Sequence, residues 1–104
     1  LWLNEGFATL MQYDGGNVFI NSPTADTPIL DLELVYEIEK AFVLDALPTS
    51  HPLSFKIDRP IEIKEAFDDI SYKKGAAVLR MIRQVLGSEA FSDGLKEYFK
   101  RHSY

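Results

Sequence analysis

Apolar residues recur at intervals of three and four positions along most of the chain, which is the period of an amphipathic α-helix. The first such segment covers residues 1 to about 13 and places Glu5 on the side opposite its apolar face. That face consists of Leu3, Phe7, Leu10 and Met11. The turn-forming sequence Asp14-Gly15-Gly16 predicts the end of this helix, and residues 14–27 are expected to form a loop.

A second helix is predicted from Thr27 to about Leu47, because Thr27 can cap it and Pro28 suits the first helical position, where a missing N–H costs nothing. Its apolar residues form two stripes, so we expect it to pack against neighbours on more than one side. The stripes are Leu32-Val35-Tyr36-Phe42-Val43 and Leu30-Leu34-Ile38-Ala41.

Prolines interrupt the chain after this helix, and alternation in residues 53–58 predicts one short extended piece at most. From Pro60 the helical period returns, with a short helix ending near Asp68-Asp69. A longer helix runs from Ser71 to Leu86, Gly87 is placed to stop it, and Ser88 starts the last helix. The expected buried positions of these helices are Ile63, Ala66, Phe67, Ile70, Gly75, Val78, Leu79, Ile82, Val85, Leu86, Phe91, Leu95, Tyr98 and Phe99.

Composition narrows the classes of function. The chain has 104 residues, a net charge of −5 and a hydrophobic fraction of 46%, which suits a globular domain with an all-α fold. The acidic balance, with no basic run longer than Lys73-Lys74, argues against nucleic acid or an anionic membrane as the partner. Because there is no Cys, disulfide frameworks, iron–sulfur centres and thiol nucleophiles are excluded as well.

The chain begins at Leu1 without an initiator Met and inside a helical pattern, so we interpret it as a piece of a longer protein. It contains no apolar run long enough for a membrane span, and no signal peptide. Without a repeat or an internal boundary, residues 1–104 are expected to form a single partial domain.

Several residues that often carry chemistry have only weak support here. His51 and His102 each lack a second His or a carboxylate at helical i+4 spacing, and Asp68-Asp69 is interpreted as a solvated helix end. Glycine-rich nucleotide-binding motifs and the serine-hydrolase elbow are absent from the sequence. The common nucleotide and serine-hydrolase functions therefore have no support.

Glu5 and Tyr72 remain as candidates, although periodicity alone favours an exposed charge for Glu5 and a core tyrosine for Tyr72. Gly6 is unusual in its position, because Gly inside a helix costs about 1 kcal/mol against Ala. This cost suggests that another part of the molecule approaches the backbone closely at Gly6.

Two blocks of the sequence carry a more specific signal. Residues 1–8 are Leu-Trp-Leu-Asn-Glu-Gly-Phe-Ala, and residues 67–76 are Phe-Asp-Asp-Ile-Ser-Tyr-Lys-Lys-Gly-Ala. The first block resembles the one that carries the third zinc ligand in the M1 family of zinc aminopeptidases, which belong to the gluzincins. The second resembles the block with that family's catalytic tyrosine, and residues 45–53 are similar to the connector of its animal members. The similarity extends over nearly the whole chain and is weakest over residues 14–26.

This resemblance implies a fragment of the helical C-terminal lobe of a thermolysin-like metallopeptidase catalytic domain. It implies that the parent protein hydrolyses the N-terminal peptide bond of peptides, with Glu5 as a ligand of Zn²⁺ and Tyr72 as the donor that stabilises the oxyanion. The implied partners are peptide substrates and the rest of the catalytic domain. The family includes membrane-anchored ectoenzymes and cytoplasmic enzymes, and either location is consistent with these residues.

The chain departs from the family pattern upstream of Glu5. The His-Glu-x-x-His helix, with two zinc ligands and the general base, and the Gly-x-Met-Glu-Asn substrate loop are both absent from these residues. One carboxylate cannot hold Zn²⁺ in a catalytic site, so the chain alone is expected to bind no zinc tightly and to cleave no peptide. We also expect exposed apolar surface that favours self-association. A catalytically dead homologue and a helical protein-interaction module remain alternatives.

Overall fold

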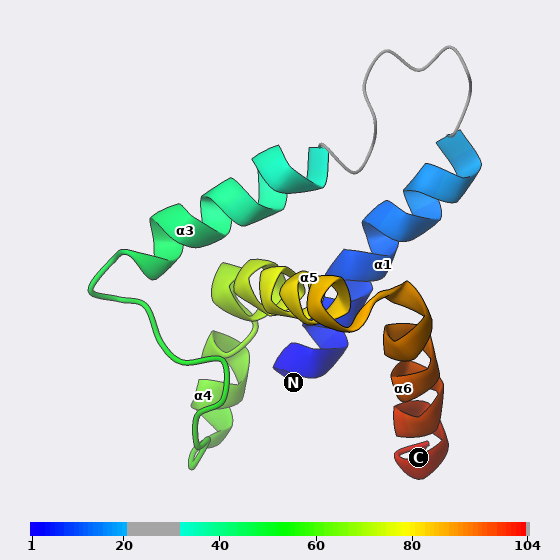
Figure 1. Cartoon of the computed structure of the whole chain (residues 1–104). Helices are drawn as coiled ribbons and strands as arrows, with labels where there is room; N and C mark the ends of the chain where they lie inside the picture. Colours follow the sequence, from blue (N-terminus) through cyan, green and yellow to red (C-terminus); the bar gives the residue numbers. More distant parts are fainter. Residues whose placement is uncertain (21–31, 104) are drawn as a thin grey trace.

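The computed structural model describes residues 1–20 and 32–103, which form an all-α fold, as predicted (Figure 1). The helices are α1 (Trp2–Ile20), the π-helical turn η1 (Leu34–Ile38) that continues into α3 (Glu39–Asp45), α4 (Pro60–Glu65), the π-helical turn η2 (Ile70–Lys74) that continues into α5 (Gly75–Leu86), and α6 (Ser88–Arg101). Within these residues there is no β-strand. None of the described helices combines the length and the apolar character that crossing a bilayer requires.

The core lies where α1 and α5 cross at the centre of the fold (Figure 1). α6 packs against α5 and contributes Phe91 to this core. The buried members are Leu10, Ala76, Leu79 and Phe91, with Trp2, Leu3 and Phe7 packed against them. The apolar faces predicted for these three helices are therefore confirmed where the helices meet.

α1 is longer than the sequence pattern predicts. The pattern ends the helix at Asp14-Gly15-Gly16, but the helix continues to Ile20. Contacts with distant parts of the chain favour this continuation, because Arg83 on α5 donates a hydrogen bond to the Asp14 carboxylate and the Tyr13 hydroxyl donates one to Glu37. These contacts offset the cost of two glycines, about 1 kcal/mol each. The loop prediction is wrong for residues 14–20, and residues 21–27 lie outside the described part.

The second predicted helix is present from Leu32 to Asp45, close to its predicted end at Leu47. Its predicted start at Thr27 and Pro28 lies outside the described residues. The connector over residues 46–59 is irregular, and residues 53–58 form no strand. Pro60 begins α4, and Gly87, with a positive φ of 82°, ends α5, as predicted.

A large part of the apolar surface is exposed. The radius of gyration is 15.2 Å, against roughly 13 Å for a compact domain of this length. The accessible surface is 7521 Å², against roughly 5,900 Å² for a folded monomer of 11.8 kDa. Positions predicted to be packed or buried that are exposed instead are Val35, Tyr36, Phe42, Val43, Ile63, Phe67, Ile82, Val85, Leu86 and Phe99. These predictions are wrong for this chain, because nothing among the described residues covers these side chains.

Candidate active site

Glu5 on α1 and Tyr72 on η2 are brought into contact by the packing of these two elements. The Glu5 carboxylate is close enough to act on the ionisation of the Tyr72 hydroxyl. The Glu5 carboxylate, assisted by desolvation, raises the pKa of Tyr72 above its ordinary value, because ionisation would place two negative charges near each other. Both side chains are partly exposed. The structure thus places the candidate zinc ligand beside the candidate catalytic tyrosine.

Glycines next to these residues allow the two helices to approach so closely. A Cβ on Gly6 would lie 2.8 Å from the carbonyl carbon of Gly75 and 3.2 Å from the amide nitrogen of Ala76. A Cβ on Gly75 would in turn lie 3.2 Å from the carbonyl oxygen of Trp2. The close approach that the sequence suggested at Gly6 is confirmed, and it fixes the spacing between the backbones that carry the candidate site.

The backbone around Tyr72 has a feature that the sequence did not indicate. Tyr72 lies in the middle of η2, where the Gly75 amide donates its hydrogen bond to the carbonyl of Ile70, five residues earlier. π-Helical turns of this kind are rare and occur frequently at functional sites. The turn directs the Tyr72 side chain towards α1 just before the regular helix α5 begins.

The residues described here provide one potential zinc ligand at this site. No group of three or more His, Cys, Asp or Glu side chains lies close enough together to hold a metal ion in the described ranges. A catalytic zinc site generally uses three protein ligands and keeps a fourth position open. The Glu5 carboxylate is an anionic oxygen donor of the type such a site accepts, so it fits one ligand position and leaves the others to residues outside this part of the chain.

His51 and Asp68 form a contact that the sequence analysis missed. His51 Nε2 lies 2.7 Å from Asp68 Oδ2, and the second carboxylate oxygen of Asp68 accepts a hydrogen bond of 2.9 Å from the Ser71 amide. The interpretation of Asp68-Asp69 as a solvated helix end is therefore wrong for Asp68, although Asp69 is exposed. His102, by comparison, is exposed at the end of α6 with its ring against Tyr98.

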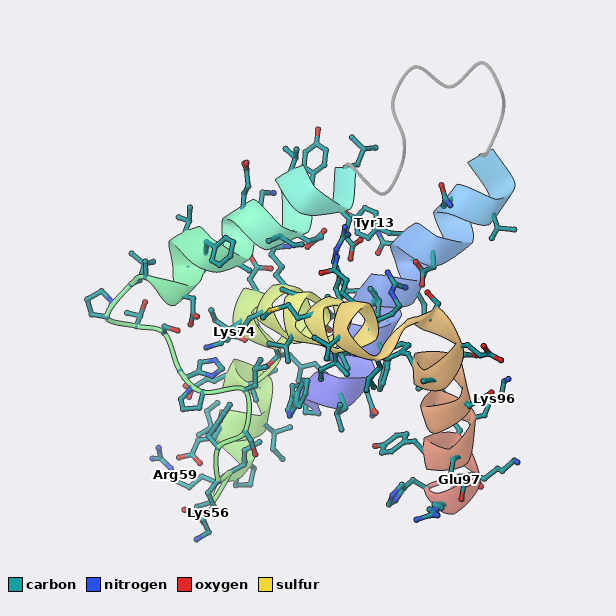
Figure 2. The ribbon with its side chains drawn as sticks, in the orientation of Figure 1. Tyr13, Lys56, Arg59, Lys74, Lys96 and Glu97 are labelled. Carbon is teal, nitrogen blue, oxygen red and sulfur yellow. The ribbon has the colours of Figure 1, made fainter. Side chains whose placement is uncertain are left out.

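A cluster of polar and charged side chains joins the second helix to η2 and α1, the two elements that carry Tyr72 and Glu5. Lys73 Nζ lies 3.0 Å from Glu37 Oε2, and the Tyr13 hydroxyl donates a hydrogen bond of 2.8 Å to the other Glu37 oxygen. Burial lowers the pKa of Lys73, but the nearby carboxylates of Glu37 and Asp69 outweigh it and the pKa is raised. Burial and Glu37 raise the pKa of Tyr13 to about 12. Figure 2 shows Tyr13 between α1 and the start of the η1–α3 segment.

Comparisons with known proteins find similarity along the entire length of the chain. The sequence profile described as the peptidase family M1 domain matches residues 1–104. Aminopeptidase N of Haemonchus contortus is 41% identical over 104 residues, aminopeptidase Ey of Gallus gallus is 45% identical over 107 residues, and endoplasmic reticulum aminopeptidase 1 of Homo sapiens is 40% identical over 107 residues. Each alignment covers 100% of this chain and 10% or 11% of the relative. The chain therefore spans about a tenth of the length of the curated relatives it matches.

Proposed function

The chain belongs to peptidase family M1, and on that premise we propose that it forms part of the active site of a zinc-dependent aminopeptidase. The proposed reaction is hydrolysis of the N-terminal peptide bond of peptide substrates. The names of the relatives support the activity, and the packing of α1 on η2 that brings Glu5 and Tyr72 together is the observation that carries the assignment of the site.

Glu5 is proposed as the one zinc ligand that this chain contributes, with the remaining ligands and the general base supplied by residues outside it. Zinc held in such a site would supply Lewis-acid activation of water and of the scissile carbonyl. Glu5 lies where α1 packs against η2, the element that carries Tyr72.

Tyr72 is proposed as the donor to the negative charge that develops on the substrate carbonyl oxygen. Its hydroxyl lies on the element that packs against α1, near Glu5. A tyrosine hydroxyl has an ordinary pKa of about 10, so it keeps its proton at neutral pH and remains a donor. A positioned donor of this type is typically worth roughly 10²–10³ in rate.

The exposed apolar surface supports a further part of the proposal. One groove on the outer side of α5 is lined by Val78, Met81, Ile82, Val85 and Leu86. Val85 is 85% exposed and Met81 63% exposed. Contiguous apolar surface of this kind marks an interaction site. Because the matched relatives are about ten times as long as this chain, we assign the rest of the catalytic domain as the partner that covers it.

Zinc content and activity of the full-length protein test the proposal. We expect zinc in the purified protein, release of N-terminal amino acids from peptides, and loss of that activity on treatment with a chelator. Glu5→Gln is expected to lose zinc, whereas Glu39→Gln, at an exposed position on α3, is expected to retain it. Aminopeptidase activity that survives metal removal, or full zinc retention in Glu5→Gln, would contradict the proposal.

The isolated 104-residue chain provides a complementary test. It is expected to contain no tightly bound zinc and to show no aminopeptidase activity, because one carboxylate does not make a catalytic zinc site. Stoichiometric zinc in the isolated chain would overturn this part of the proposal. A full-length protein with neither zinc nor activity would favour the alternatives, a catalytically dead homologue or a helical interaction module.

A further inference from the structure

His51 lies in the connector between α3 and α4, and both of its ring nitrogens face hydrogen-bond acceptors. Nδ1 lies 2.8 Å from the carbonyl oxygen of Pro52, and Nε2 lies 2.7 Å from Asp68 Oδ2. A carbonyl oxygen and a carboxylate can only accept, so each contact requires a proton on the facing nitrogen. Neutral imidazole carries only one N–H. Both contacts can therefore be hydrogen bonds only when the His51 ring is protonated.

Asp68 connects this histidine to the element that carries Tyr72. While Oδ2 faces His51, Oδ1 accepts the hydrogen bond from the Ser71 amide at the start of η2. The Tyr72 amide donates to the main-chain carbonyl of Asp68 at 3.2 Å. Ser71 itself is 1% exposed, and its hydroxyl donates to the carbonyl of Ala66 at 2.7 Å. Asp68 thus fixes the first turn of η2 directly before Tyr72.

We propose that protonated His51 is a positioning residue for Tyr72, acting through Asp68 to hold the start of η2, and that its deprotonation weakens catalysis. This inference rests on the proposed aminopeptidase function. When His51 loses its proton, one of its two contacts is lost and the carboxylate of Asp68 is no longer paired with a cation. The first turn of η2 is then held less firmly, and the Tyr72 hydroxyl is presented less accurately to the substrate.

The charged groups around His51 favour its protonated form on balance. Burial lowers the pKa of His51 and the positive charge of Lys74 acts in the same direction, but the hydrogen bonds with the Pro52 carbonyl and with Asp68 outweigh them, so the pKa is raised. Lys74 Nζ lies 2.7 Å from Asp45 Oδ1, which keeps that cation partly neutralised. Figure 2 shows Lys74 on the side of the η2–α5 helix that faces the connector. The ring of Phe55, which meets the His51 ring edge-on, is uncharged, and Asp45 is the further charged group that acts on His51.

The direction of the pH effect follows from these shifts. His51 has a raised pKa in the folded state, so its contribution is complete below its ordinary value of 6.5 and is lost as the pH rises through the raised value. Burial raises the pKa of Asp68, but the hydrogen bonds from Ser71 and His51 outweigh it and the pKa is lowered below 3.8. The contribution of Asp68 is therefore present above 3.8 and is lost in stronger acid. His51 and Asp68 are therefore both charged, and their contact is intact, from pH 3.8 up to the raised pKa of His51.

The test uses three variants of the full-length enzyme. His51→Phe keeps an aromatic ring against Phe55 but removes both N–H groups. His51→Gln retains an uncharged donor towards Asp68 at every pH. His102→Gln is the matched control, because it changes the other histidine of the chain, which is exposed and distant from Asp68. Steady-state kinetics between about pH 6 and pH 9 are measured for each, together with hydrogen–deuterium exchange of the amides of residues 66–75.

At about pH 6 we expect His51→Phe to lower kcat by roughly tenfold with little change in KM, because a charge-assisted hydrogen bond that orients a catalytic group is lost. The alkaline decline of the wild-type kcat that His51 causes is expected to disappear in His51→Gln, with kcat closer to the wild type than in His51→Phe. His102→Gln is expected to behave like the wild type. Identical pH profiles of kcat for wild type and His51→Gln would overturn the inference.

Amide exchange separates failure of this inference from failure of the proposed function. Faster exchange of the Ser71 and Tyr72 amides in His51→Phe is expected whether or not the protein is an aminopeptidase, and unchanged exchange would overturn the inference alone. If the wild-type protein has no aminopeptidase activity, the proposed function fails. The catalytic part of the inference then fails with it, and only the structural link between His51 and η2 is tested by exchange.

Discussion

Gly6 and Gly75 meet through their backbones, and a Cβ on Gly6 would lie 2.8 Å from the carbonyl carbon of Gly75. Backbone atoms cannot yield as a flexible side chain does, so Gly6→Ala is expected to destabilise the protein by about 1–3 kcal/mol. Gly94→Ala is the control, because a Cβ there meets nothing within 4 Å and Gly94 lies inside α6. That change is expected to stabilise by about 0.5–1 kcal/mol. Urea denaturation measures both, and equal stability of the two variants would contradict the close helix contact.

The parts of the fold that the sequence predicts well are those with local signals. α4 begins at Pro60 and α5 ends at Gly87, because a fixed φ and a positive φ are properties of single residues. The end of α1 is different, since the local signal of Gly15-Gly16 competes with contacts to Arg83 and Glu37 that no local pattern reports. Exposed faces such as Val85 were also unpredictable, because periodicity identifies an apolar face but not which partner covers it.

The residues of the candidate site also differ in how well the sequence identifies them. Glu5 and Tyr72 were found because each lies in a characteristic sequence block, whereas periodicity alone favoured ordinary structural roles for both. The contact of His51 with Asp68 had no comparable signal. The two residues are 17 positions apart across an irregular connector, so no helical or strand spacing relates them.

Tyr13 provides a prediction at alkaline pH. Its pKa is raised from 10.0 to about 12 by burial and by the hydrogen bond to Glu37. An acid with a raised folded-state pKa contributes stability that is complete below 10.0 and is lost as the pH rises through about 12. The free energy of unfolding is expected to decline over this range, and less steeply in Tyr13→Phe. Tyr98→Phe, on α6 and not among the groups that raise the pKa of Tyr13, should leave the decline unchanged, and a wild-type slope in Tyr13→Phe would count against the effect.

The ion pair of Glu33 with Arg80 gives a prediction about a buried charge. The Glu33 side chain is 1% exposed and its carboxylate accepts a hydrogen bond from Arg80 Nη1. Arg80→Met leaves that charge without its main partner, so we expect a loss of about 3–5 kcal/mol in the free energy of unfolding. Arg59→Met, whose ion pair is at the surface, is expected to cost no more than about 1 kcal/mol.

The pH dependence of the Arg80→Met effect offers a check on its cause. Burial raises the pKa of Glu33 even with Arg80 present. The loss in Arg80→Met should therefore shrink as the pH falls towards that raised value, because protonation neutralises the buried carboxyl. A loss that stays constant with pH would indicate that packing, not charge, is responsible.

The outer groove of α5 leads to a prediction about association. In the isolated 104-residue chain, exposed Met81 and Val85 are expected to promote self-association, because nothing among the described residues covers them. Val85→Lys should lower the sedimentation-average mass at a given concentration. Glu97→Lys introduces the same side chain at an exposed position near the C-terminal end of α6, outside the groove (Figure 2), and should not. Equal masses for wild type and Val85→Lys would exclude this groove as the associating surface.

Tyr72→Phe in the full-length enzyme tests the central claim, that the hydroxyl beside Glu5 stabilises the oxyanion. The expected result is a fall in kcat of roughly 10²–10³-fold with KM nearly unchanged and zinc content equal to that of the wild type. Tyr36→Phe, which removes an exposed hydroxyl from the second helix, should leave kcat unaffected. A Tyr72→Phe enzyme that retains the wild-type kcat would contradict the claim.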